Sequence, residues 1–355
     1  MDKLLFWILG IFAVLGALDR IFGSHFGLGR EFEEGIKTMG PLTLAMVGIV
    51  TLAPVLAAGL KPVVVPVFRF LGADPAMFAG SILACDMGGG ALARQLTEDP
   101  QAAALGGVIT GSMLGATLVF TIPVALGILQ PEDRPFLAKG VLCGIVTIPI
   151  GVLVGGLAAG FPIGMVLCNL IPIVILAALI ALGLWKAEHA MVRGFTLFGQ
   201  FVVVLSTIGL GAGILESLTG FTLLPGMAPL KEGLETVGAI AVVLAGAFPL
   251  VYLLTKLLQK PLTAAGRLLG INDAAAAGLI ASLANSIAAF DLVKDMNPRG
   301  KVVNIAFAVS AAFVFGDHLG FAAGFAPEIL PAMIAGKLAG GISAVLCARA
   351  LTKKD

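Results

Sequence analysis

Apolar runs of about 18 or more residues recur along the whole length of this chain, and each could cross about 30 Å of hydrocarbon as one helix. Of the 355 residues, 59% are hydrophobic and 12% are charged, which lies outside the range of soluble globular proteins. Helices satisfy their own backbone hydrogen bonds inside a bilayer. The sequence therefore predicts an all-α polytopic membrane protein set in a lipid bilayer. The first run, residues 4–18, lacks a small-residue cleavage site and is expected to be a retained helix.

Charge and cysteine usage exclude several classes of function. The formal net charge is +1, which favours neither a nucleic-acid partner nor a polybasic membrane-surface role. The four cysteines stand singly in apolar segments, so we expect no disulfide framework, no metal site and no cofactor. An intramembrane protease or metalloenzyme would need paired aspartates in suitable motifs, a Ser/His dyad or a motif such as HExxH. The three histidines form no such pattern, and we do not expect an enzyme.

The segment at about 75–98 can be read in two ways. As one helix it is long enough to span, but Gly88, Gly89 and Gly90 at its centre would each cost about 1 kcal/mol relative to alanine. As a re-entrant hairpin it has two arms of about ten residues, each reaching about 15 Å, with Asp86 at the tip. We favour the hairpin. The preceding residues, 61–72, contain two prolines and two cations and predict an interfacial helix.

The second half of the chain repeats the first. Residues 32–40 align with residues 230–238 at an offset of 198, and this offset holds without a gap for about sixty further residues. Internal duplication is typical of transporter folds. It divides the chain into a first helix and loop (1–31), repeat 1 (32–158), linking helices (159–229) and repeat 2 (230–355).

The duplication places a second hairpin at about 273–296, with Asn285 and Ser286 at its tip. If both hairpins return to their own side, an odd number of crossings separates the repeats, and one repeat is inverted relative to the other. If both were full spans, the repeats would be parallel. The cations occupy the same loop position in both halves and do not decide between these alternatives. We favour an inverted repeat with two re-entrant hairpins.

Two glycine-rich stretches, residues 85–90 and 316–321, place ionisable groups inside apolar runs. An unneutralised carboxylate in hydrocarbon costs several kcal/mol. Asp86 and Asp317 should therefore face protein, water or a bound cation. For Asp86, the structural alternative is that it caps helix ends or pairs with Arg94.

Several separated motifs resemble those of a known family. They are residues 38–48, 78–80, 84–89, 144–151, 308–313 and 316–323. Over essentially its whole length, the chain resembles the ethanolamine utilisation transporter family EutH. The resemblance implies uptake of ethanolamine across a bacterial cytoplasmic (inner) membrane, to supply ethanolamine catabolism. The order of elements is also similar to that of concentrative nucleoside transporters, which is an analogy of fold alone.

Ethanolamine has an ammonium group, which needs a carboxylate or aromatic faces. It also has a hydroxyl group, which needs a hydrogen-bond donor and an acceptor. Helices broken at mid-depth are expected at about 103–128 and 302–325, facing the hairpin tips. Each hydroxyl side chain there could instead bond its own backbone. The acid and imidazole at 317–318 could bind the cation, relay a proton or bond the opposite hairpin. The predicted substrate-binding residues are Asp86, Met87, Asn285, Ser286, Asp317, His318, Ser112, Thr117 and Thr121.

The predicted mechanism is alternating access, with the two hairpin tips closing on the substrate. Another small amine or amino alcohol is an alternative substrate, and a non-transporting receptor-like membrane protein is an alternative function. Proton coupling and facilitated diffusion both stay open. The spacings Gly111–Gly115 and Gly336–Gly340 indicate close helix packing, and flat faces of small residues suit a homo-oligomer.

Overall fold

The computed structural model describes residues 2–352, with side chains throughout this range except those of residues 2, 3, 188, 258–265, 267 and 268. Every regular element in the described range is helical, as predicted. Eight helical stretches are long and apolar enough to cross a membrane, which confirms a polytopic membrane protein. They are Leu4–Ile21, Leu28–Phe70, Pro100–Ile128, Pro131–Ala158, Ile163–Ala187, His189–Thr219, Leu230–Leu257 and Pro327–Leu351.

The first half of the chain begins with a helix that packs on the next one and ends with a long span. Its elements are α1 (Asp2–Ile21), α2 (Leu28–Lys37), α3 (Met39–Leu42), the π-helix η1 (Thr43–Val47), α4 (Gly48–Phe70), α5 (Ala76–Ile82), the 3-10 turn η2 (Cys85–Met87), α6 (Gly89–Leu96), α7 (Pro100–Ala104), the π-helices η3 (Leu105–Gly115) and η4 (Thr117–Thr121), α8 (Ile122–Ile128), the 3-10 turn η5 (Pro131–Asp133) and α9 (Arg134–Ala158).

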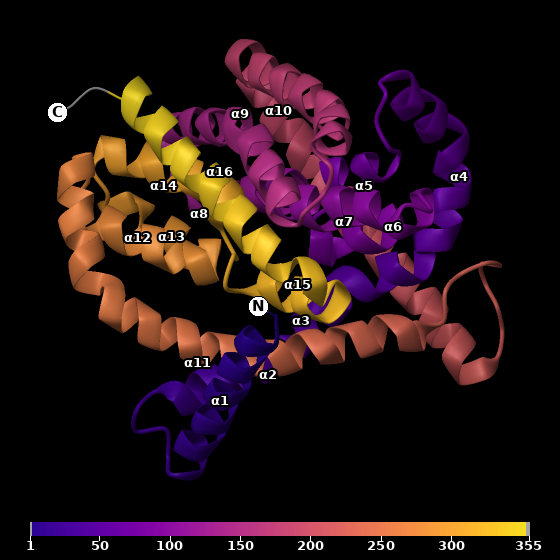
Figure 1. Cartoon of the computed structure of the whole chain (residues 1–355), viewed down its shortest axis with the longest axis horizontal. Coiled ribbons are helices and arrows are strands. Elements are labelled where there is room, and N and C mark those ends of the chain that lie inside the picture. Colours follow the sequence, from indigo (N-terminus) through magenta and orange to yellow (C-terminus); the bar gives the residue numbers. More distant parts are fainter. Residues whose placement is uncertain (1, 353–355) are drawn as a thin grey trace.

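The second half contains two long helices followed by shorter ones. α10 changes direction at Ala187, whose φ of −145° and ψ of 48° are not helical, so it supplies two spans. In Figure 1, α11 bends along one edge of the molecule. α16 runs diagonally across the molecule and packs against α9 and α14. The elements are α10 (Ile163–Thr219), α11 (Leu230–Leu269), α12 (Asp273–Ala284), α13 (Ser286–Asp291), the 3-10 turn η6 (Val293–Asp295), α14 (Pro298–Ala311), α15 (Asp317–Phe325), the 3-10 turn η7 (Pro327–Ile329) and α16 (Leu330–Leu351).

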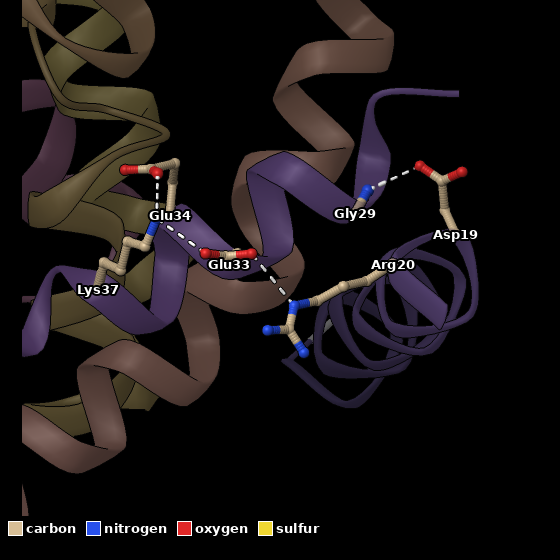
Figure 2. Close-up of polar contacts among 6 residues, drawn as sticks. All are labelled: Asp19, Arg20, Gly29, Glu33, Glu34 and Lys37. Carbon is tan, nitrogen blue, oxygen red and sulfur yellow. Dashed lines mark hydrogen bonds and ion pairs between the residues drawn. The ribbon is translucent and has the colours of Figure 1, made fainter. Parts of the chain in front are cut away.

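The connection between α1 and α2 is held by polar contacts (Figure 2). The carboxylate of Asp19 accepts a hydrogen bond of 2.8 Å from the backbone nitrogen of Gly29, and Arg20 forms an ion pair of 3.2 Å with Glu33. Lys37 reaches the other carboxylate oxygen of Glu33 at 2.9 Å. The exposed ion pairs contribute little individually. The buried carboxylate of Asp19, which also accepts from the backbone nitrogen of Phe26 at 3.0 Å, joins the end of α1 to the start of α2.

The predicted interfacial helix at residues 61–72 is not a separate element. α4 continues through Pro62 and Pro66 as far as Phe70, and residues 260–269 likewise continue α11. Proline removes one backbone donor from a helix but leaves the rest of the ladder in place, and membrane helices tolerate it. The segment is helical, as expected, but it does not form a separate helix, and its position along the membrane surface stays a prediction.

Both predicted hairpins have the geometry of a helix, a short break and a helix. In hairpin 1, Thr97 Oγ1 at the end donates to Asp74 Oδ2 at the start, at 2.8 Å. In hairpin 2, Asn272 Nδ2 donates to the carbonyl oxygen of Asp295 at 2.8 Å. Each segment thus ends beside the point where it begins. Whether the hairpins are re-entrant in a bilayer, and whether the repeats are inverted, stay predictions.

Only one of the two predicted broken spans is broken. Residues 100–128 stay helical throughout, because wide π-helical turns in η3 and η4 lead into Pro123 without an interruption. The break expected there was wrong. Between α14 and α15, by contrast, residues 312–316 leave the helical conformation, and Phe313 has a φ of +60°.

The small-residue spacings mark close helix packing, as predicted. A Cβ atom at Gly115 would overlap the carbonyl oxygen of Leu83, so only glycine at this position lets hairpin 1 lie this close to η3. A Cβ atom at Gly336 would lie 2.7 Å from the carbonyl oxygen of Gly151. This contact places α16 directly against α9, inside a large apolar core that also includes η3 and α14.

Candidate transport site

Asp86 lies at the tip of hairpin 1, in the 3-10 turn η2, and only 9% of its surface is exposed. The turn is closed by Gly88, which adopts a φ of +94°. A Cβ atom there would also overlap the side chain of Ile49 on α4. Glycine is therefore needed at position 88 for both its backbone angle and its lack of a side chain. The turn holds a carboxylate inside the bundle, where water cannot solvate it freely.

The break between α14 and α15 carries the second ionisable stretch to the same place. The backbone nitrogen of Phe313 donates to the carbonyl oxygen of Ser282 at 3.0 Å, and that of Phe315 donates to Leu283 at 2.9 Å. These bonds attach the break to the last turn of α12. The backbone groups that the break frees from α14 are satisfied in this way. α15 then begins with Asp317 and His318.

Three ionisable side chains form a buried line across the bundle. His318 Nε2 lies 3.7 Å from Asp86 Oδ1, and His318 Nδ1 lies 3.0 Å from Lys337 Nζ on α16. Lys337 Nζ also donates to the carbonyl oxygen of Ser112, at 2.5 Å. Lys337 and His318 are 1% and 3% exposed. The arrangement thus links α16, α15 and the tip of hairpin 1.

Asp86 and Asp317 line two adjoining cavities. The larger has a volume of about 830 Å³ and is walled by η4, α8 and the second half of α10, with Gln200 and Thr196 among its polar groups. The smaller, of about 30 Å³, lies between Asp86, Asp317 and the ring of Phe313. Met87 lines both. Both carboxylates therefore belong to the lining of the larger cavity as well as of the smaller one.

Comparison with known proteins identifies the family. The family model described as "Ethanolamine utilisation protein, EutH" matches residues 1–351. This chain belongs to the EutH family. The resemblance inferred from separated motifs is confirmed.

Three EutH-family relatives match over nearly the full length. The chain is 59% identical to "Probable ethanolamine permease EutH" of Listeria monocytogenes, over 97% of this chain and 92% of that one. It is 47% identical to the protein of the same name from Salmonella typhimurium, over 100% and 96%. It is 52% identical to "Uncharacterized protein YxeR" of Bacillus subtilis, over 98% and 94%. No solved structure matches.

Four of the residues predicted to bind substrate in this EutH-family chain lie together. Asp86, Met87, Asp317 and His318 all line the smaller cavity. Lys337 was missed, although an isolated lysine in the apolar run of α16 is the same signal that singled out Asp86.

The three predicted hydroxyl ligands of η3 and η4 are buried, and two of them bond backbone carbonyls. Ser112 Oγ donates to Ile109 at 2.9 Å, and Thr117 Oγ1 donates to Met113 at 2.7 Å and to Val309 at 3.0 Å. Thr121 is 2% exposed. These contacts match the alternative in which hydroxyls satisfy their own helix.

The tip of hairpin 2 lies apart from the cavities. Asn285 is exposed and its Oδ1 accepts from the backbone nitrogen of Ile287 at 2.8 Å, whereas Ser286 is fully buried. Among the residues that the structure describes, the lining of both cavities includes hairpin 1 and α15 and none of α12 or α13. Hairpin 2 is instead connected to the site by the backbone hydrogen bonds that residues 313 and 315 donate to the end of α12.

Arg94 does not pair with Asp86. Its guanidinium donates to the carbonyl oxygen of Phe325 at 2.5 Å and lies 3.5 Å from the centre of the Phe325 ring. This cation–π contact joins the base of hairpin 1 to the end of α15.

Cys85, Asp86 and His318 bring their ligand-type atoms within 4.8 Å of one another. Lys337 contacts the other nitrogen of the same imidazole, and its positive charge would repel a metal ion bound there.

Proposed function

We propose that this chain is a permease for ethanolamine in the bacterial cytoplasmic membrane, taking up the ammonium form by alternating access to supply ethanolamine catabolism. The observation that carries the proposal is a cavity of about 830 Å³ whose lining includes Asp86 and Asp317, inside a helical membrane bundle. Carboxylates buried in this way need a cation to offset the loss of hydration. The printed names of the Listeria and Salmonella relatives support the same substrate.

In this proposal the substrate ammonium binds between Asp86 and Asp317. The small cavity there is also lined by Phe120 and Phe313, whose ring faces attract cations. The substrate hydroxyl points into the larger cavity, where the amide of Gln200 can donate and accept hydrogen bonds.

We also propose that the two hairpins are re-entrant and that the repeats are inverted. The bonds that close the hairpins support this, because Asp74 and Thr97 lie 198 positions before Asn272 and Asp295. Helical arms joined at their base can enter and leave the membrane on one side. With that return, five spans separate the start of repeat 1 from the start of repeat 2, an odd number that reverses its direction.

A larger amine or amino alcohol is the second candidate substrate. Ethanolamine has only four non-hydrogen atoms, and the cavity volume of about 830 Å³ exceeds what such a molecule fills. Competition experiments separate these candidates.

The decisive experiment is uptake of radiolabelled ethanolamine by proteoliposomes that contain the purified protein. Saturable uptake, inhibited by unlabelled ethanolamine more strongly than by choline or serine, is the expected result. An imposed pH gradient then distinguishes proton coupling from facilitated diffusion. Uptake equal to that of empty liposomes, from protein with a cooperative melting transition, would refute the permease function. Stronger inhibition by choline would instead indicate the larger substrate.

A further inference from the structure

Lys337 has no role in the function proposed above, yet its side chain lies in the middle of the transport machinery. It is 1% exposed within the apolar helix α16. A buried ammonium costs several kcal/mol unless partners compensate for it. Its two polar contacts are the carbonyl oxygen of Ser112 at 2.5 Å and Nδ1 of His318 at 3.0 Å. Close packing of Gly336 against α9 holds the backbone of α16 at this position.

These contacts determine which nitrogen of His318 carries the hydrogen. An ammonium group can only donate hydrogen bonds, so Nδ1 of His318 must accept one from Lys337. The ring hydrogen is then on Nε2, which faces Asp86 Oδ1 at 3.7 Å. Lys337 thereby orients a neutral imidazole whose N–H points toward the carboxylate. The lysine acts on Asp86 through the ring of His318 and not by direct contact.

The charges at the end of the cavity can be counted from these positions. In their ordinary ionised forms, Asp86 and Asp317 would contribute two negative charges and Lys337 one positive charge. The neighbouring Cys85 Sγ lies 4.0 Å from Asp86 Oδ1, toward which it donates. Within the part of the chain that the structure describes, Lys337 is the one lysine or arginine that contacts this group, since Arg94 is held by Phe325. One negative charge remains.

We propose that Lys337 is a specificity-determining residue that sets the charge of the transport site, so that the site takes one monovalent organic ammonium ion and disfavours a divalent one. The proposal rests on the proposed function, because it assumes that the substrate binds as an ammonium ion. A monovalent ammonium neutralises the remaining charge, whereas a diamine carrying two charges leaves an excess positive charge in a buried site. Removing the lysine charge would leave two carboxylates to accept the second ammonium.

The test compares two inhibitors of radiolabelled ethanolamine uptake in proteoliposomes: unlabelled ethanolamine and 1,3-diaminopropane, which carries two charges at neutral pH. The wild-type protein is expected to prefer ethanolamine by about tenfold or more, as one unmatched charge near a binding site requires. In Lys337→Met, the inhibition constant of the diamine relative to that of ethanolamine should fall by about tenfold. Lys337→Arg keeps the charge and should keep the wild-type preference. Lys231→Met, on the exposed start of α11, is the matched control and should leave the ratio unchanged.

The outcomes separate this proposal from the proposed function. If the wild-type protein takes up no ethanolamine, the proposed function fails. If it takes up ethanolamine but binds 1,3-diaminopropane as tightly, Lys337 does not set the charge of the site, although the permease function stands. An unchanged ratio in a folded Lys337→Met variant overturns the proposal in the same way. Because the wild-type ratio alone can refute it, the test does not depend on the stability of the variant.

Discussion

Nζ of Lys337 lies 3.0 Å from Nδ1 of His318, although the two residues belong to different helices. The lysine is on α16, and the histidine is the second residue of α15, which follows a non-helical break. Each side chain occupies a site that would be unfavourable for it alone, since both are almost completely buried. Their mutual contact therefore has consequences for stability as well as for transport.

Replacing His318 with glutamine should reduce both stability and uptake. The substitution removes the imidazole nitrogen that lies 3.0 Å from the buried Lys337 ammonium and leaves the carbonyl oxygen of Ser112 as its acceptor, and the loss of a buried hydrogen-bond partner costs about 1–3 kcal/mol. We expect a lower melting temperature in detergent and a loss of ethanolamine uptake in proteoliposomes. His189→Gln, at an exposed position in α10, is the control. A His318→Gln protein with wild-type melting and uptake would show that the line of contacts has no energetic importance.

Asp86→Asn and Asp317→Asn should each lower ethanolamine uptake by at least about tenfold, which corresponds to about 1.4 kcal/mol of binding free energy. Both carboxylates line the cavity, and the amide replacement preserves shape while it removes charge. Initial rates of uptake at several substrate concentrations measure the effect. Asp291→Asn, exposed on α13, provides a comparison with the same chemical change. Normal transport by both cavity variants would rule out the site assignment.

Gly88→Ala should destabilise the tip of hairpin 1 by about 1–3 kcal/mol and abolish uptake. The alanine would have to adopt a φ of +94°, and its Cβ atom would overlap Ile49. Gly72→Ala separates these two causes, because Gly72 also has a positive φ, of +71°, but has open space around it. Thermal unfolding of the two variants gives the comparison. Equal losses of stability would mean that backbone strain accounts for the effect and that the contact with Ile49 does not.

Thr97→Val should loosen the base of hairpin 1. The change removes the hydroxyl that donates to Asp74 Oδ2 while it keeps a side chain of similar shape, so a cost of about 0.5–1.5 kcal/mol is expected. Hydrogen exchange of α5 and α6, measured by mass spectrometry, should increase in the variant. Thr207→Val removes a hydroxyl that bonds only its own helix and should leave these segments unchanged. Protection of α5 and α6 identical to wild type would contradict a closing role for this bond.

Much of the architecture could be predicted because hydrophobic length and glycine position act locally. The apolar runs gave the spans, and the three glycines after Met87 predicted a turn where η2 now lies. The ionisable groups at 86, 317 and 318 stood out because charge inside an apolar run is costly. Lys337 meets the same criterion, but its flanking glycines indicated only helix packing.

The remaining features depend on contacts between distant segments. The break before Asp317 bonds to the end of α12, and no periodicity in either segment encodes that pairing. The sequence likewise did not predict that residues 105–121 stay helical. The glycines and Pro123 suggested a break, but wider π-helical turns accommodate them. The position of Asn285, outside the lining of both cavities, also follows from how α12 and α13 pack and could not be read from the polarity of the tip.

The two backbone hydrogen bonds from Phe313 and Phe315 to the end of α12 connect hairpin 2 to a site that it does not line. A displacement of α12 would pull the start of α15, and Asp317 and His318 would move with it. Motion of the second hairpin would thereby change the spacing between the two carboxylates without any contact between Asn285 and the substrate.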